Sequence, residues 1–107
     1  MRAIDQLTVF GTGLLGTSLG LALKQAGFAG RRVGIGRRQA TVEQARQRGA
    51  FDAVTTDPGE GVAGADLLVV AVPLGQFEAV LGQVACHASA GLIVTDVGSV
   101  KGEVVAA

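Results

Sequence analysis

With 107 residues, of which 49% are hydrophobic and only 4% aromatic, the chain is long enough for one domain whose core is built from aliphatic side chains. Nine basic and nine acidic side chains cancel, which argues against a nucleic-acid-binding surface and predicts no nucleic-acid partner. One cysteine excludes an intrachain disulfide, and no apolar run approaches the ~18 residues of a membrane span, so we expect a cytoplasmic protein with no membrane partner.

The first elements along the chain are expected to be a strand over residues 6–10 and a helix over residues 14–26. Between them lies the run Gly11-Thr12-Gly13-Leu14-Leu15-Gly16. A strand, a glycine turn of this spacing and a helix are typical of a dinucleotide-binding fingerprint, although a glycine turn without a ligand is the simpler alternative. We expect all six residues to contact a cofactor, with its phosphates at the N–H groups of the helix start.

Each glycine of this run has a separate expected role. Gly11 permits the tight turn, Gly13 lets a pyrophosphate approach the backbone, and Gly16 lets the helix pack closely on the strand.

A second strand is expected over residues 32–36 and a second helix over residues 42–48. Gly34 and Gly36 are unusual inside a strand and predict close approach by a ligand or another backbone segment. Thr41 and Gln44 have the spacing of a capping box, which would start the helix at Thr41.

The remaining elements continue the alternation of strands and helices. The pair Asp57-Pro58 predicts a helix cap, followed by a poor helix at best. The expected elements are a short strand around 53–54, a central strand over 67–72 closed by Pro73, a helix over 74–86, a strand over 92–97 and a helix opening at 98–102.

This alternation predicts an α/β fold, a doubly wound parallel sheet of strand order 3-2-1-4-5, forming one dinucleotide-binding domain over residues 1–107. Ligands of such sheets bind at the carboxyl ends of the strands, at the switch point between the first and the fourth strand. We therefore expect one cleft, with no metal, ringed by Gly11–Gly16, Gly36–Arg38, Val72–Pro73 and Thr95–Ser99.

Three segments carry a family resemblance. Residues 11–19, the run Ala71-Val72-Pro73-Leu74 and the run Val94-Thr95-Asp96-Val97-Gly98-Ser99-Val100-Lys101-Gly102 resemble the amino-terminal domain of prephenate and arogenate dehydrogenases. The resemblance implies a Rossmann domain that binds NAD or NADP. It also implies an oxidative decarboxylation in tyrosine biosynthesis, with prephenate or arogenate as the substrate. A helical domain that completes the substrate site and forms a homodimer would lie outside these residues.

The resemblance also assigns roles at the end of the chain. It implies that Val72, Pro73, Gly98 and Ser99 contact the cofactor, and that Ser99 lies beside the nicotinamide and supports a catalytic histidine. An N-cap of the last expected helix is the alternative role of Ser99, and both can hold. The family's histidine would lie about twenty residues beyond the Gly-Ser-Val-Lys block, so His87 is expected to be a solvated helix-end residue and these 107 residues alone to be inactive.

The position that carries an acidic residue in NAD-using Rossmann domains falls on Gly36. Arg37 and Arg38 follow directly, and Thr41 adds a hydroxyl, so we expect these four residues to favour NADP, with NAD still possible. Two solvated arginines on an exposed turn are the alternative.

Two other functions remain open from the sequence. One is the cofactor domain of another two-domain dehydrogenase, of a hydroxyacid or pyrroline-carboxylate type. The other is a non-catalytic dinucleotide-binding or redox-sensing module.

Overall fold

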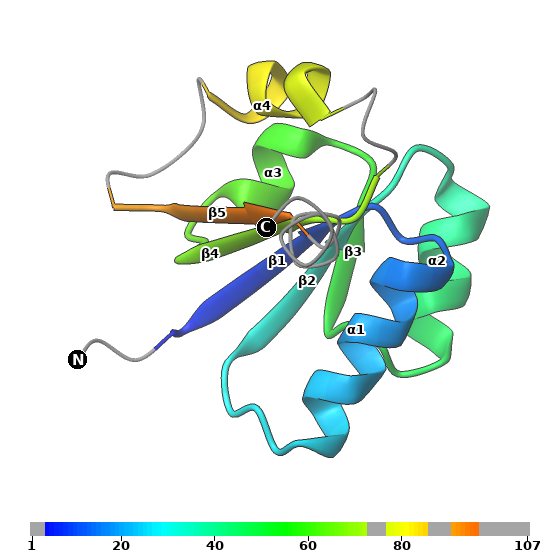
Figure 1. The fold of residues 1–107 in the computed structure, drawn as a ribbon. Coiled ribbons are helices and arrows are strands. Elements are labelled where there is room, and N and C mark those ends of the chain that lie inside the picture. Colours follow the sequence, from blue (N-terminus) through cyan, green and yellow to red (C-terminus); the bar gives the residue numbers. More distant parts are fainter. Residues whose placement is uncertain (1–3, 73–76, 86–90, 97–107) are drawn as a thin grey trace, which may run out of the picture.

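Five strands alternate with four helices in the computed structural model, which describes residues 4–72, 77–85 and 91–96 (Figure 1). The strands are β1 (Gln6–Phe10), β2 (Arg31–Ile35), β3 (Ala53–Thr55), β4 (Leu67–Val70) and β5 (Ile93–Asp96). The helices are α1 (Leu14–Gln25), α2 (Gln39–Gln47), α3 (Pro58–Val62) and α4 (Phe77–Ala85). Among these helices, none is long and apolar enough to cross a membrane.

All strands are parallel, and their order is β3-β2-β1-β4-β5, which confirms the predicted fold. β1 is the middle strand: its Val9 lies opposite Gly34 of β2 and Val69 of β4. The chain leaves β1 towards β2 on one side and returns to β4 on the other. This change of direction opens a crevice at the carboxyl end of β1.

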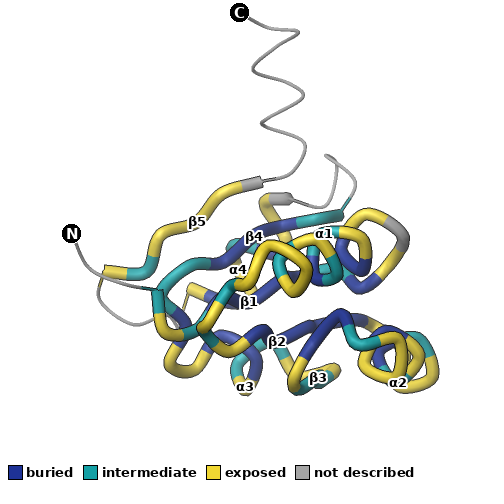
Figure 2. Tube along the Cα trace, turned by 90° about the horizontal axis from the view of Figure 1, so that it is seen from below, coloured by how far each residue is buried: buried dark blue, intermediate teal, exposed yellow. Residues whose placement is uncertain are grey.

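Helices cover both faces of the sheet, with α1 and α2 on one side and α3 and α4 on the other (Figure 1). Figure 2 shows that buried residues follow the central strands, whereas β5 at the sheet edge is largely exposed. The core under α3 and α4 consists of Phe10, Ile35, Val62, Leu68, Val70, Val80 and Val84. The core on the α1 and α2 side consists of Leu7, Val9, Ala45, Ala50, Phe51 and Val69.

The predicted capping box at Thr41 is wrong. α2 begins at Gln39, and its N-cap is Arg38, whose backbone is extended and whose side chain makes no capping bond. The amide of Val42 donates to the carbonyl of Arg38 at 3.1 Å, so Thr41 already lies inside the first turn. Val42 is fully buried, and its packing explains why tertiary structure overrides the local capping pattern.

Other element boundaries differ less. The predicted cap at Asp57 is confirmed, because its carboxylate accepts a hydrogen bond from the amide of Gly59 at 3.0 Å and starts α3. β4 ends at Val70, two residues earlier than expected, and the helix expected from residue 98 lies outside the described residues. The close approach expected at Gly34 is made by the ring of Phe51, so the expectation of a ligand or a backbone segment there is wrong.

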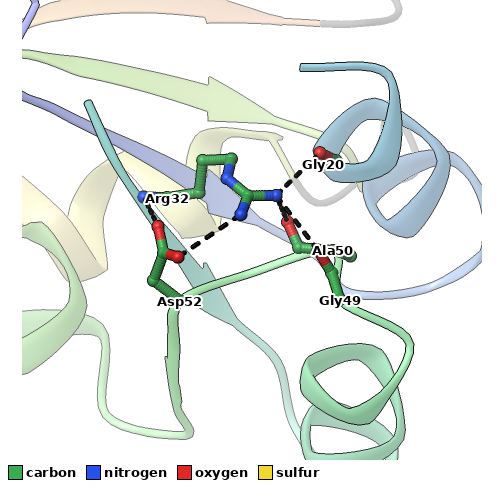
Figure 3. Close-up of polar contacts among 5 residues, drawn as sticks. All are labelled: Gly20, Arg32, Gly49, Ala50 and Asp52. Carbon is green, nitrogen blue, oxygen red and sulfur yellow. Dashed lines mark hydrogen bonds and ion pairs between the residues drawn. The ribbon is translucent and has the colours of Figure 1, made fainter. Parts of the chain in front are cut away.

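A buried arginine joins three elements on the α1 and α2 face. The guanidinium of Arg32 donates to the carbonyl oxygens of Gly20, Gly49 and Ala50 at 2.9–3.2 Å (Figure 3). It also pairs with the carboxylate of Asp52 at 3.3 Å, which in turn accepts the Arg32 amide at 2.9 Å. These bonds satisfy a cation that is only 8% exposed and tie α1 and the connection from α2 to β3 onto β2.

Candidate dinucleotide-binding site

A cleft of about 820 Å³ opens at the carboxyl ends of β1, β2 and β4, where the topology predicts a ligand site. Its walls come from the loops after these strands, from the start of α3 and from one side of α4. The lining residues are Phe10–Gly13, Ile35–Arg38, Thr41, Thr56–Gly59, Ala71, Val72, Ala79, Val80 and Gln83.

Gly11 makes the tight turn that the sequence predicts. Its φ of +115° is a conformation that L side chains rarely adopt, and its amide donates to the carbonyl of Ile35 at 2.7 Å. A β-carbon on Gly11 would also lie 2.5 Å from the carbonyl oxygen of Ala71. The chain can therefore leave β1 this way only with glycine at this position.

Gly13 is the N-cap of α1, and it leaves the helix start open. No side chain caps this end, and the amide of Thr17 closes the first turn by donating to the Gly13 carbonyl at 2.9 Å. A β-carbon built on Gly13 would meet no atom within 4 Å. The cleft is therefore open beside Gly13, at the start of α1, whose first amides have no partner within the helix. Phosphate binding at a helix start requires such space.

Gly16 lies one turn into α1 and is buried. A β-carbon there would collide with the carbonyl oxygen of Gly11 and would lie 3.3 Å from Cγ1 of Val9. The predicted close packing of α1 on β1 at Gly16 is confirmed, and the tightest contact of Gly16 is with the Gly11 carbonyl in the glycine turn.

The basic side of the cleft lies between β2 and α2. Arg37 and Arg38 are exposed and line the cleft, and Thr41 lines it from the first turn of α2. Arg46, further along α2, pairs with Glu43; this hydrogen bond lowers the pKa of the Glu43 carboxyl and raises that of the Arg46 guanidinium. Arg46 does not line the cleft, whereas Arg37 and Arg38, directly before α2, do.

The structure brings together eight of the predicted cofactor contacts, namely Gly11, Thr12, Gly13, Gly36, Arg37, Arg38, Thr41 and Val72. Leu14 is the first residue of α1, and Leu15 is 59% exposed on that helix. The predicted contacts Pro73, Gly98 and Ser99, and also His87, lie outside the described residues.

One wall of the cleft was not predicted from the sequence; it is formed by the loop before α3, by the start of α3 and by α4. Its residues are Thr56, Asp57, Pro58, Gly59, Ala79, Val80 and Gln83. The Asp-Pro-Gly turn directly after β3 is a usable signal, because it too lies at the carboxyl end of a strand. The α4 residues carry no such signal, because they reach the cleft through helix packing.

Comparisons with known proteins agree with this architecture. The family model "Prephenate dehydrogenase, nucleotide-binding domain" matches residues 19–107. A prephenate dehydrogenase of Lactococcus lactis subsp. cremoris is 33% identical over 104 residues, which is 95% of this chain and 28% of that enzyme. The chain therefore spans little more than a quarter of this relative.

Two solved structures show the same fold. Arogenate dehydrogenase from Synechocystis matches with a TM-score of 0.79 and 30% identity, over 86% of this chain and 32% of that one. Prephenate dehydrogenase from A. aeolicus, in complex with hydroxyphenyl propionate and NAD+, matches with a TM-score of 0.81 and 21% identity, over 89% and 34% of the two chains. With the family match over most of its length, the chain belongs to the prephenate dehydrogenase nucleotide-binding domain family.

Proposed function

We propose that this chain binds NADP or NAD in the cleft beside Gly13 and serves as the cofactor domain of a prephenate or arogenate dehydrogenase. The observation that carries this proposal is the uncapped start of α1, which opens into the cleft where a β-carbon on Gly13 would meet nothing. Helix N-termini of this kind bind phosphate through their free amides. Membership of the family connects this geometry with a nicotinamide cofactor.

In the proposed reaction, hydride leaves the ring carbon that bears the 4-hydroxyl of prephenate or arogenate. Carbon dioxide departs from the ring, and the electron pair of the broken carbon–carbon bond stays in the ring, which becomes aromatic and keeps its 4-hydroxyl. The bound nicotinamide supplies the hydride acceptor. The residues of this chain hold the dinucleotide: the α1 amides bind its pyrophosphate, and the β2–α2 turn binds its adenosine end.

Ser99 is proposed to lie beside the nicotinamide and to support the histidine that binds the substrate hydroxyl. That histidine and the substrate-binding groups are proposed to belong to a helical domain through which the complete protein forms a homodimer. On this proposal the 107 residues bind cofactor and do not oxidise prephenate by themselves.

We further propose that the domain prefers NADP. Position 36, where NAD-binding domains carry a carboxylate for the ribose 2′-hydroxyl, is a glycine, and Arg37 and Arg38 follow it in the cleft. Guanidinium groups suit a phosphate because they are planar, permanently charged and able to bond two oxygens. Because both side chains are exposed, we expect a preference of about tenfold.

Calorimetric titration of the chain with NADP and with NAD tests both proposals. The double variant Arg37→Ala, Arg38→Ala should lose the preference, and raised salt should reduce it in the unmodified chain. A matched control is Arg31→Ala, Arg48→Ala, which removes the same charge from two exposed positions that do not line the cleft. Binding of neither cofactor contradicts the proposed function, whereas equal binding of both, or equal effects of the two double variants, contradicts only the NADP preference.

A further inference from the structure

Position 36 has no room for a side chain. Gly36 follows β2 directly and is buried, and a β-carbon built on it would lie 2.5 Å from Cγ1 of Val42 and closer still to Oγ1 of Thr12. Real β-carbons essentially never approach other atoms within 3.0 Å. The φ of Gly36 is outside the left-handed range, so this restriction comes from neighbouring side chains and not from the backbone.

Neither neighbour can move aside easily. Thr12 is 5% exposed, and its carbonyl accepts a hydrogen bond from the hydroxyl of Thr17 at 3.0 Å. Val42 is fully buried in α2. Gly36 itself is held from the other side, because its amide donates to the carbonyl of Thr55 at 3.1 Å. Position 36 is therefore enclosed by the loop after β1, by α2 and by the end of β3.

Gly13 lines the same cleft, but it has room for a β-carbon. A β-carbon there would meet no protein atom within 4 Å, so the protein itself does not require glycine at that position. At Gly36 an added β-carbon would force the side chain of Thr12 or Val42 to shift. At position 36, packing within the protein disfavours a side chain. At position 13, only a bound ligand would disfavour one.

We propose that Thr12 and Val42 determine cofactor specificity indirectly, by excluding a carboxylate from position 36. This inference rests on the proposed function, because its consequence concerns the adenosine ribose of a dinucleotide. An acidic side chain at the end of the second strand accepts bonds from a ribose 2′-hydroxyl and repels a 2′-phosphate. With Thr12 and Val42 in place, that side chain cannot be accommodated, and position 36 presents no carboxylate to a ribose 2′-phosphate.

The packing part is tested by thermal unfolding in two backgrounds. Gly36→Ala in the unmodified chain should lower Tm by about 5–15 °C, because small-to-large changes in a packed site strain it. In a Thr12→Ala, Val42→Ala background, which removes both obstructing atoms, the same substitution should change Tm by less than about 3 °C. Gly82→Ala, on the exposed side of α4 where a β-carbon meets nothing, is the control and should not lower Tm. Equal losses in both backgrounds, or no loss in either, overturn the proposal.

The specificity part uses the same relieved background. There Gly36→Asp should shift the ratio of the NAD and NADP dissociation constants towards NAD by about tenfold, and Gly36→Asn, of equal size and no charge, should shift it much less. An unchanged ratio with Asp, or equal shifts with Asp and Asn, overturns the specificity role. If the unmodified chain binds neither cofactor, the proposed function fails and the specificity role fails with it, while the Tm measurements still report on the packing.

Discussion

The carbonyl oxygen of Gly11 lies where a β-carbon of Gly16 would have to be. Five residues apart in sequence, the two glycines bring the start of α1 against the turn that leaves β1. This contact fixes the start of α1 beside the cleft that Gly11 and Gly13 line, because the helix cannot shift along its axis without changing the close approach to the turn. The position of the helix start is thus set by backbone packing that only glycine allows.

Gly16→Ala should therefore be severely destabilising. The added methyl group meets a backbone carbonyl, which cannot rotate away as a side chain would, so we expect a loss of at least about 3 kcal/mol in the free energy of unfolding. Gly82→Ala is the matched control and should raise stability by about 0.5–1 kcal/mol, because it lies in an exposed helix position. Urea denaturation measures both changes, and similar values for the two variants would contradict the packing argument.

Gly13→Ala should leave stability nearly unchanged and weaken dinucleotide binding. The backbone of Gly13 is extended with a φ of −73°, which alanine adopts without strain, and a β-carbon there meets nothing. We expect the free energy of unfolding to change by less than about 1 kcal/mol. Dinucleotide affinity should fall by at least about tenfold, because the methyl group occupies the space through which a pyrophosphate approaches the amides. Calorimetry on the folded variant measures this, and unchanged affinity would place the phosphates elsewhere.

Arg32 should matter more for stability than its partner Asp52. Arg32→Met removes the donor from three carbonyl oxygens and from the Asp52 carboxylate, and we expect a loss of about 3 kcal/mol. Asp52→Asn should cost about 1 kcal/mol, because this side chain is 47% exposed and an amide oxygen can still accept the Arg32 amide.

Arg31→Met is the control for the loss of one charge, because Arg31 is the exposed neighbour on the same strand. It should leave the midpoint of urea unfolding nearly unchanged. If Arg31→Met and Arg32→Met have equal effects, the buried hydrogen bonds of Arg32 do not stabilise the domain.

Ser99→Ala tests the proposed role of the Gly-Ser-Val-Lys block in a complete enzyme that contains this domain. A hydrogen bond that positions the catalytic histidine acts mainly in the transition state, so kcat should fall by about tenfold or more while the cofactor dissociation constant changes little. Ser99→Thr, which keeps a hydroxyl, should recover part of the rate. Loss of cofactor affinity at an unchanged kcat would assign Ser99 a role in binding or capping only.

Much of the architecture could be predicted because its signals are local. The apolar run at β4, the glycine turn after β1 and the Asp57 cap each depend on neighbouring residues, and the strand order follows from the alternation of elements. The start of α2 could not be predicted in this way. Its position depends on Val42 entering the core, which outweighs the Thr41 capping pattern.

The partners of buried groups could not be predicted from neighbouring residues either. Nothing in the sequence near Arg32 indicates carbonyl acceptors 12, 17 and 18 residues away. Thr12 likewise lies 24 positions from Gly36 in the sequence. Its side chain limits the space at Gly36 only because the pairing of β1 with β2 brings the two loops together. The sequence could show that position 36 lacks an acid, but not that packing excludes one.

A 15N–1H NMR titration of the chain with NADP tests most directly whether the cofactor binds at the start of α1. We expect the largest amide shifts at Thr12–Gly16 and Gly36–Arg38, around the open start of α1 and the basic turn. Gly27 and Gly64, which follow α1 and α3 away from the cleft, should shift little. Saturable shifts confined to the cleft would support a cofactor site at the start of α1, and the absence of shifts at Thr12–Gly16 would contradict it.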